Sequence, residues 1–250
     1  MTLESLILFL IAVAFGSYVQ TVTGFAIGLI IMGMVSTFDL APIAFSANVI
    51  CFLALCNGLI ALRRSHTSVD WKIARLVLIG AIPAMIGGVC LLSYLSQSAT
   101  STIKLVLGIV VITGGCLLML KPNVRKGLEP SWSFLLSGFV AGGLGGLFST
   151  GGPPLVYHLY RQPISINVIR TTLLAIMLIF AVALTVAVGV QGQIDMEVLK
   201  YSLFSIPVVT LFTLIGNRYP PPLSDENRRR FAFFLLIVIG GSLVLTGLNG

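Results

Sequence analysis

The feature that most constrains this chain is a glycine- and proline-rich run, from Gly142 to Pro154, inside otherwise apolar sequence. Six glycines in eleven residues weaken a helix, and the Pro153-Pro154 pair forbids its continuation while suiting the start of a new one. The hydroxyls of Ser149 and Thr150 stand just before the restart, where we expect them to cap freed backbone N–H groups. The run therefore predicts two helical arms separated by a break held inside the protein.

A fainter copy of this run occurs about 127 residues earlier, between Gln20 and Gly28. It reads Gln-Thr-Val-Thr-Gly-Phe-Ala-Ile-Gly. A helix break that recurs in each half of a membrane protein is typical of a transporter's binding site. For Gly142, Gly143, Gly145 and Gly146, close packing of helices is an equally good explanation.

The composition places the chain in a bilayer. Of its 250 residues, 57% are hydrophobic and 9% are charged, whereas soluble domains carry roughly 25% charged residues. We expect one integral membrane domain over residues 1–250, with the apolar start retained as mature structure. The net charge of +7 lies in short loops between apolar spans, which indicates membrane topology and not nucleic-acid binding. The four cysteines lie in apolar segments and are predicted to be small buried residues.

Six segments are apolar enough, and close enough to the roughly 20 residues that a bilayer requires, to be membrane spans. They are 42–62, 71–95, 102–120, 166–190, 198–217 and 230–247. Two further apolar stretches contain the breaks, and we predict hairpins there, with arms 3–21 and 25–38 and arms 132–149 and 153–161. The last arm is too short to cross hydrocarbon.

The basic residues orient these spans. Thirteen of the fifteen lysines and arginines fall in loops on one side, and Lys104 and Lys200 are left for the other. By the positive-inside rule the thirteen face the cytoplasm, so both termini are expected on the outer side.

The two halves match at several positions. Thr23-Gly24 matches Thr150-Gly151, Asp70 matches Asp195, and Pro83 matches Pro207. The charge pattern reverses the direction of matching spans, so we predict an all-α polytopic membrane protein of two inverted repeats, 1–125 and 126–250. Each repeat is a broken-helix hairpin followed by three transmembrane helices, with the two tips near the midplane.

The tips suit an anion, because a half-helix presents the positive end of its dipole and free N–H groups. Arg161 and Arg170 would draw an anion from the cytoplasm, with a role in setting topology alone as the favoured alternative. No carboxylate lies at mid-membrane, which argues against coupling through a buried Asp or Glu. His158 is a candidate proton carrier, with a packing histidine as the favoured alternative. Asn48 and Asn57 are expected either to donate to the anion or, more readily, to join helices.

The tip Gln20-x-x-Thr23-Gly24-Phe25 and the run Ser149-Thr150-Gly151-Gly152-Pro153-Pro154 resemble the TauE/SafE family, over nearly the whole chain. That resemblance implies a bacterial inner-membrane exporter of sulfite, sulfoacetate or related organosulfonates. The family motif carries over to Gln20, Thr23, Gly24, Ser149, Thr150, Gly151 and Gly152.

The sequence thus predicts a secondary carrier, not an enzyme, that exports small oxyanions by alternating access, without cofactor or metal. Its expected partners are the anion and the lipid bilayer, with no nucleic acid, and a homo-oligomer is left open. The alternatives are an anion channel of the same fold and an intramembrane hydrolase using Ser149 with His158. The predicted substrate-binding residues are Gln20, Thr23, Gly24, Phe25, Asn48, Ser149, Thr150, Gly151, Gly152, His158, Arg161 and Arg170.

Overall fold

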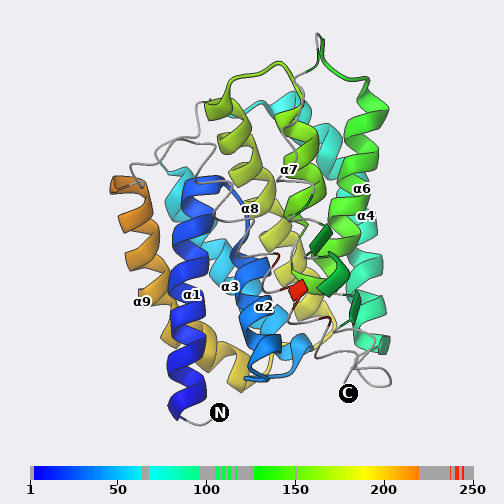
Figure 1. Ribbon diagram of the computed structural model, residues 1–250. Helices are drawn as coiled ribbons and strands as arrows, with labels where there is room; N and C mark the ends of the chain where they lie inside the picture. Colours follow the sequence, from blue (N-terminus) through cyan, green and yellow to red (C-terminus); the bar gives the residue numbers. More distant parts are fainter. Residues whose placement is uncertain are drawn as a thin grey trace.

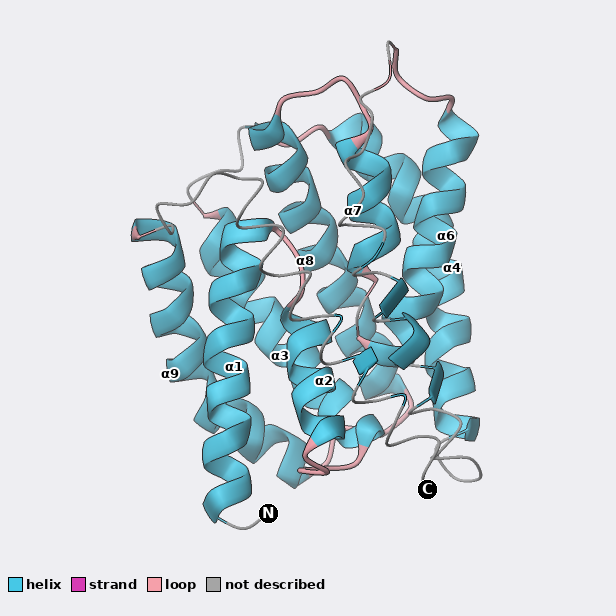
Figure 2. Ribbon diagram, viewed as in Figure 1, coloured by secondary structure: helices cyan, strands magenta, loops and turns pink. Residues whose placement is uncertain are grey.

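The computed structural model describes residues 3–63, 68–95, 125, 127–149 and 151–219, with isolated positions in 105–116 and 237–244. Over these residues the regular structure is helical, without strands (Figures 1 and 2). The longer helices are α1 (Leu3–Thr23), α2 (Ile27–Thr37), α3 (Ile43–Leu62), α4 (Trp71–Leu95), α6 (Ser131–Phe148), α7 (Gly152–Tyr160), α8 (Ile166–Val190) and α9 (Met196–Arg218).

The predicted membrane spans agree with the helices. The segments predicted at 42–62, 71–95, 166–190 and 198–217 are α3, α4, α8 and α9. Both first arms, α1 and α6, are also long and apolar enough to cross a bilayer, which makes six candidate spans among the described helices. The spans predicted at 102–120 and 230–247 lie largely outside the described residues. The chain is therefore a multi-pass, all-helical membrane protein.

Both predicted helix breaks are present. The first lies between Thr23 and Ile27, and the second between Phe148 and Gly152. Backbone in the left-handed region turns the chain at each: Gly24 and Ala26 have φ of 91° and 96°, and Ser149 has φ of 53°. The helices that follow, α2 with 11 residues and α7 with 9, are too short for the ~30 Å of hydrocarbon at a rise of about 1.5 Å per residue.

The two hairpins open toward opposite ends of the molecule (Figure 1). The α1–α2 hairpin opens at the lower end of the view, where the N-terminus lies, and the α6–α7 hairpin opens at the upper end. Each break therefore points into the body of the protein, where backbone that leaves the helical pattern is shielded from lipid.

A close contact between α4 and α6 accounts for several glycines. A Cβ atom at Gly138, Gly142 or Gly146 would lie 2.1 Å from a backbone carbonyl oxygen of α4. These glycines are spaced by four residues, so they form one stripe along α6 that lets the two backbones approach. The packing explanation thus holds for Gly142 and Gly146, whereas Gly143 faces open space.

The cysteines are less buried than predicted. Cys51 is buried, but Cys90 and Cys116 are exposed on the protein surface. The prediction was wrong for these two because a bilayer solvates an apolar thiol as well as a protein core does, so apolar sequence alone does not imply burial.

Asn57 joins three helices. Its Nδ2 lies 3.1 Å from the Ser17 carbonyl oxygen and 3.1 Å from Thr21 Oγ1 on α1, and 2.7 Å from Thr213 Oγ1 on α9. The side chain is fully buried in α3. Of the two roles considered for Asn57, the structure confirms the joining of helices.

Replacing Asn57 with alanine is expected to lower the free energy of unfolding by about 1 kcal/mol, since the amide shares two protons among the three acceptors and each hydrogen bond is worth about 0.6 kcal/mol in a membrane protein. Thermal unfolding in detergent measures the change. Asn167→Ala is a suitable control, because Asn167 is exposed near the start of α8. Equal stability of the two variants would contradict the assigned role of Asn57.

Candidate substrate site

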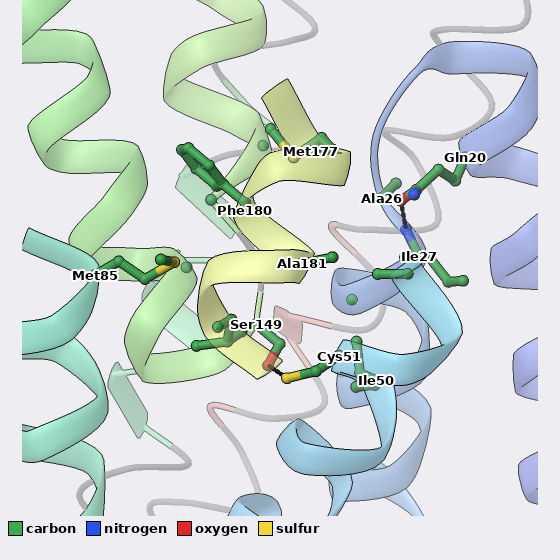
Figure 3. Close-up of a pocket in the computed structure, with 16 residues that line it drawn as sticks. Gln20, Ala26, Ile27, Ile50, Cys51, Met85, Ser149, Met177, Phe180 and Ala181 are labelled. Atoms are coloured by element: carbon green, nitrogen blue, oxygen red, sulfur yellow. Dashed lines mark hydrogen bonds between the residues drawn. The ribbon is translucent and has the colours of Figure 1, made fainter. Parts of the chain in front are cut away.

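The two helix breaks meet at one cavity of about 40 Å³ (Figure 3). The first break contributes Gln20, Ala26, Ile27 and Gly28, and the second contributes Gly145, Ser149, Gly151 and Gly152. The rest of the wall comes from α3, α4 and α8: Ile50, Cys51, Ala54, Met85, Met177, Phe180, Ala181 and Leu184. Four of the predicted site residues, Gln20, Ser149, Gly151 and Gly152, therefore line a common space although they are distant in sequence.

Gln20 stabilises the first tip, the turn of the chain between Thr23 and Ile27. Its Oε1 accepts a hydrogen bond of 3.1 Å from the backbone N–H of Ile27, the first residue of α2. The side chain is 3% exposed and borders the cavity. One N–H group at the start of α2 is thus already satisfied by the protein, and Gln20 acts as a helix cap from seven residues upstream.

Ser149 does not cap α7, and this expectation was wrong. Its Oγ donates to the Ala47 carbonyl oxygen of α3 at 3.0 Å. The same oxygen lies 3.8 Å from Cys51 Sγ (Figure 3). The left-handed backbone at Ser149 ends α6, and its hydroxyl joins the second tip to α3. Thr150 lies outside the described residues.

The N-terminus of α7 is uncapped by any described side chain and carries few donors. Its N-cap residue is Gly151, and its first three positions are Gly152, Pro153 and Pro154. Because proline lacks an N–H, Gly152 alone among these three positions offers one. The positive end of the helix dipole faces the cavity region, but Pro153 and Pro154 contribute no N–H to it.

Glycine is required at the second tip by close backbone approach. A Cβ at Gly151 would lie 2.1 Å from the Ala141 carbonyl oxygen, and a Cβ at Gly152 would lie 3.1 Å from Cβ of Phe25. The second contact also shows that the two tips touch each other.

Thr23, Gly24 and Phe25 shape the first break without lining the cavity. The Thr23 hydroxyl lies 2.8 Å from the Val19 carbonyl oxygen and 2.9 Å from that of Phe25. Gly24, in the left-handed region, packs against the backbone of Arg170, and Phe25 is buried. These residues position the start of α2.

The two predicted arginines lie away from the cavity lining. Arg170 donates from Nη2 to the Thr21 carbonyl oxygen in the last turn of α1, where a cation also suits the negative end of the helix dipole. The Arg161 guanidinium carbon lies 5.6 Å from the centre of the Tyr157 ring. Asn48 also lies outside the cavity lining, and its Nδ2 donates to the Gln193 carbonyl oxygen at 3.1 Å.

His158 belongs to a polar cluster at the open end of the α6–α7 hairpin. Its Nδ1 lies 3.7 Å from Glu129 Oε2, its Nε2 lies 3.5 Å from Ser133 Oγ, and its ring packs edge-on against Phe134. Among the described residues, the polar contacts of His158 are with Glu129 and Ser133, and those of Ser149 are with Ala47 and Cys51. The geometry gives His158 a packing and hydrogen-bonding role between α6 and α7.

The stability of this cluster should depend on pH. The hydrogen bond from the Ser133 hydroxyl, with His158 and Arg125 nearby, lowers the pKa of the Glu129 carboxyl below its ordinary value. A depressed pKa in the folded protein means that the stabilisation is complete above the unfolded pKa of about 4.3 and is lost as pH falls through the folded pKa.

We expect the melting temperature of Glu129→Gln to vary less with pH than that of the unchanged protein below about pH 4.3. Thermal unfolding across a pH series measures this, with Glu197→Gln as the control because Glu197 is exposed. Parallel curves for the unchanged protein and Glu129→Gln would contradict the role of the carboxylate.

The sequence missed the apolar walls of the cavity. Phe180, Met177 and Cys51 resemble every other apolar residue of their spans, so no pattern marked them. The available signal was positional, because α3 and α8 are the full spans that directly follow the two broken helices.

A multi-pass helical protein in which two broken helices meet at a buried cavity has the architecture of a membrane transporter. Comparison with known proteins gives the family. Residues 8–243 match the family described as "Sulfite exporter TauE/SafE", and the chain belongs to this family. Its members are transporters, which excludes the hydrolase alternative.

Two curated relatives carry related names. The chain is 39% identical over 234 residues to the "Probable sulfite/organosulfonate exporter TauE" of Cupriavidus necator, covering 94% of this chain and 91% of the relative. It is 30% identical over 116 residues to the "Probable inner membrane transporter protein TsaS" of Comamonas testosteroni, covering 46% and 48% of the two chains. No solved structure gives a significant match.

Proposed function

We propose that this protein is a secondary carrier that exports small sulfur-containing oxyanions, sulfite or a small organosulfonate, from the cytoplasm by alternating access. The observation that carries the proposal is the meeting of the two helix breaks at one cavity. The relative from Cupriavidus necator, named as a sulfite or organosulfonate exporter, supports the substrate class. The proposed cargo is bound near Gln20, Ser149, Gly151 and Gly152.

The electrostatics favour a small anion. Among the described residues no charged side chain lines the cavity, and the described carboxylates lie at or near helix ends. The start of α2 and the start of α7 border the cavity and supply the positive ends of two helix dipoles. A cavity of about 40 Å³ suits a compact ion such as sulfite in the conformation described.

Many carriers that work by alternating access are built from two related halves, and we propose that residues 1–125 and 126–250 are inverted repeats. Matching helices of the two halves make matching contacts, which supports this. The contact of α1 with α9 corresponds to that of α6 with α4, and the contact of α3 with α9 corresponds to that of α8 with α4. The matched aspartates both cap the start of a helix. Asp70 accepts a hydrogen bond from the N–H of Ile73 in α4, and Asp195 accepts one from the N–H of Val198 in α9. We place both termini outside the inner membrane.

Transport in proteoliposomes tests the proposal. Purified protein should give saturable sulfite counterflow, and sulfite or sulfoacetate should raise its melting temperature more than acetate does. Sulfate and thiosulfate complete the ligand series. Absence of both counterflow and any oxyanion-dependent stabilisation would contradict the proposal, while unsaturable ionic currents would favour an anion channel.

A further inference from the structure

A second cavity, of about 320 Å³, lies at the end of the molecule where the α1–α2 hairpin opens. It is bounded by the start of α3, the end of α4 and the connection between α8 and α9. The residues that line it are Ala44, Phe45, Asn48, Leu92, Ser93, Gln193, Asp195 and Val198. Asp195 is exposed and Asn48 is 7% exposed, so the cavity runs from the surface into the protein.

This cavity and the cavity between the tips lie along one face of α3. Ala44 and Asn48 line the outer one, and Cys51 lines the inner one. Residues spaced by four and then three positions share a helix face. The rise from Asn48 to Cys51 is about 4.5 Å, so the two spaces are separated by less than one helical turn.

The second tip contacts α3 between the two cavities. Ser149 Oγ donates to the Ala47 carbonyl oxygen and lies 3.8 Å from Cys51 Sγ, at the level of α3 that separates the cavities. Because α7 follows directly after this contact, a movement of the α6–α7 tip away from α3 would remove the barrier.

The outer cavity is furnished with neutral hydrogen-bonding groups. Gln193 Nε2 donates to Ser93 Oγ at 2.6 Å and to Gln191 Oε1 at 2.7 Å, and Asn48 Nδ2 donates to the Gln193 carbonyl oxygen. The lone charged residue of its described lining is Asp195, whose Oδ1 caps α9. Asn48 Nδ2 has a second N–H beyond its bond to Gln193, and the Gln193 amide would donate to an oxyanion only by exchanging its present acceptors. This exchange and the carboxylate at the mouth both disfavour prolonged binding of an oxyanion, which suits release.

We propose that the outer cavity is the exit vestibule of the transport path, a second and weaker oxyanion subsite reached from the tip cavity when the Ser149 contact with α3 opens. This inference rests on the proposed export function. The proposal gives a role to Asn48, Ser93 and Gln193, which do not line the cavity between the tips.

Site-directed thiol labelling tests the vestibule. Ala44→Cys is introduced into a background in which Cys56, Cys90 and Cys116 are alanine, and a membrane-impermeant methanethiosulfonate reagent is added from outside to cells or right-side-out vesicles. Sulfite transport by the untreated protein tests the proposed function by itself. Loss of transport on treatment, together with slower labelling in excess sulfite, is the result expected for the vestibule.

Two controls make the outcome decisive. The background without Ala44→Cys reports any reaction at Cys51, and Glu197→Cys, exposed at the start of α9 and outside the cavity lining, should be labelled without loss of transport. Phe45→Cys, at an apolar and partly exposed position of the same lining, replaces Ala44→Cys if the latter fails to fold. Full labelling with undiminished transport, or labelling from the cytoplasmic side alone, would overturn the inference.

Discussion

Replacing Gly151 with leucine is expected to abolish sulfite transport while the protein still inserts into the membrane. Any side chain at this position meets the Ala141 carbonyl oxygen, since a Cβ would lie 2.1 Å from it, and the ring of Phe180 is 3.2 Å away. Backbone atoms cannot yield as the end of a flexible side chain can. The start of α7 must therefore leave its place at the cavity, and with it the proposed anion contacts.

Counterflow of sulfite in proteoliposomes measures this loss, and the amount of folded protein in the membrane is measured in parallel. Gly151→Ala is the milder form of the same change and should already reduce transport severely. Gly143→Leu is the matched control, because a side chain there meets open space. Normal transport by Gly151→Leu would rule out the second tip as part of the site.

The second large effect is expected on stability, from Gly142→Ala. A Cβ at Gly142 would lie 2.1 Å from the Ala81 carbonyl oxygen and 2.6 Å from its Cα, in the contact of α6 with α4. The helices must separate to admit it, and overpacking of this kind typically costs about 1–3 kcal/mol and sometimes more. We expect a loss at or above the upper end of that range, because the clash is between backbones.

Thermal unfolding in detergent measures the effect, and the neighbouring glycine provides the comparison. Gly143→Ala places the same methyl group one residue away, where nothing lies within 4 Å. Since alanine favours a helix over glycine by up to about 1 kcal/mol, Gly143→Ala should be neutral or slightly stabilising. Similar melting temperatures for the two variants would show that the contact between α4 and α6 tolerates a side chain.

Helix breaks and spans could be predicted from sequence because their causes are local. Glycine and proline interrupt a helix wherever they occur, and the thickness of hydrocarbon fixes the length of a span. Both hairpins and the four spans that the structure describes follow from these two facts. The apolar wall made by Phe180, Met177 and Cys51 had no such cause, since burial against a particular neighbour leaves no mark in an apolar segment.

Polar residues were harder to place because their partners are distant in sequence. Arg170 was expected to attract substrate, yet it contacts the end of α1, 149 residues away. Ser149 was expected to cap the next helix, yet its left-handed backbone ends α6 and its hydroxyl donates a hydrogen bond to α3. Short-range chemistry identifies which groups can form hydrogen bonds, whereas tertiary packing decides with which partner they do so.

The paired prolines at the start of α7 bear on how selective such a carrier can be. They remove two N–H donors from the helix end but leave the helix dipole. An anion bound there is therefore attracted chiefly by the field of the dipole, which is the same whatever substituent the sulfur atom has. If the proposed cargo is correct, discrimination among sulfite and its organic derivatives is left to the size of the cavity and to the apolar surfaces of Phe180 and Met177. Weakly directed attraction of this kind favours broad cargo tolerance and rapid unloading over tight retention.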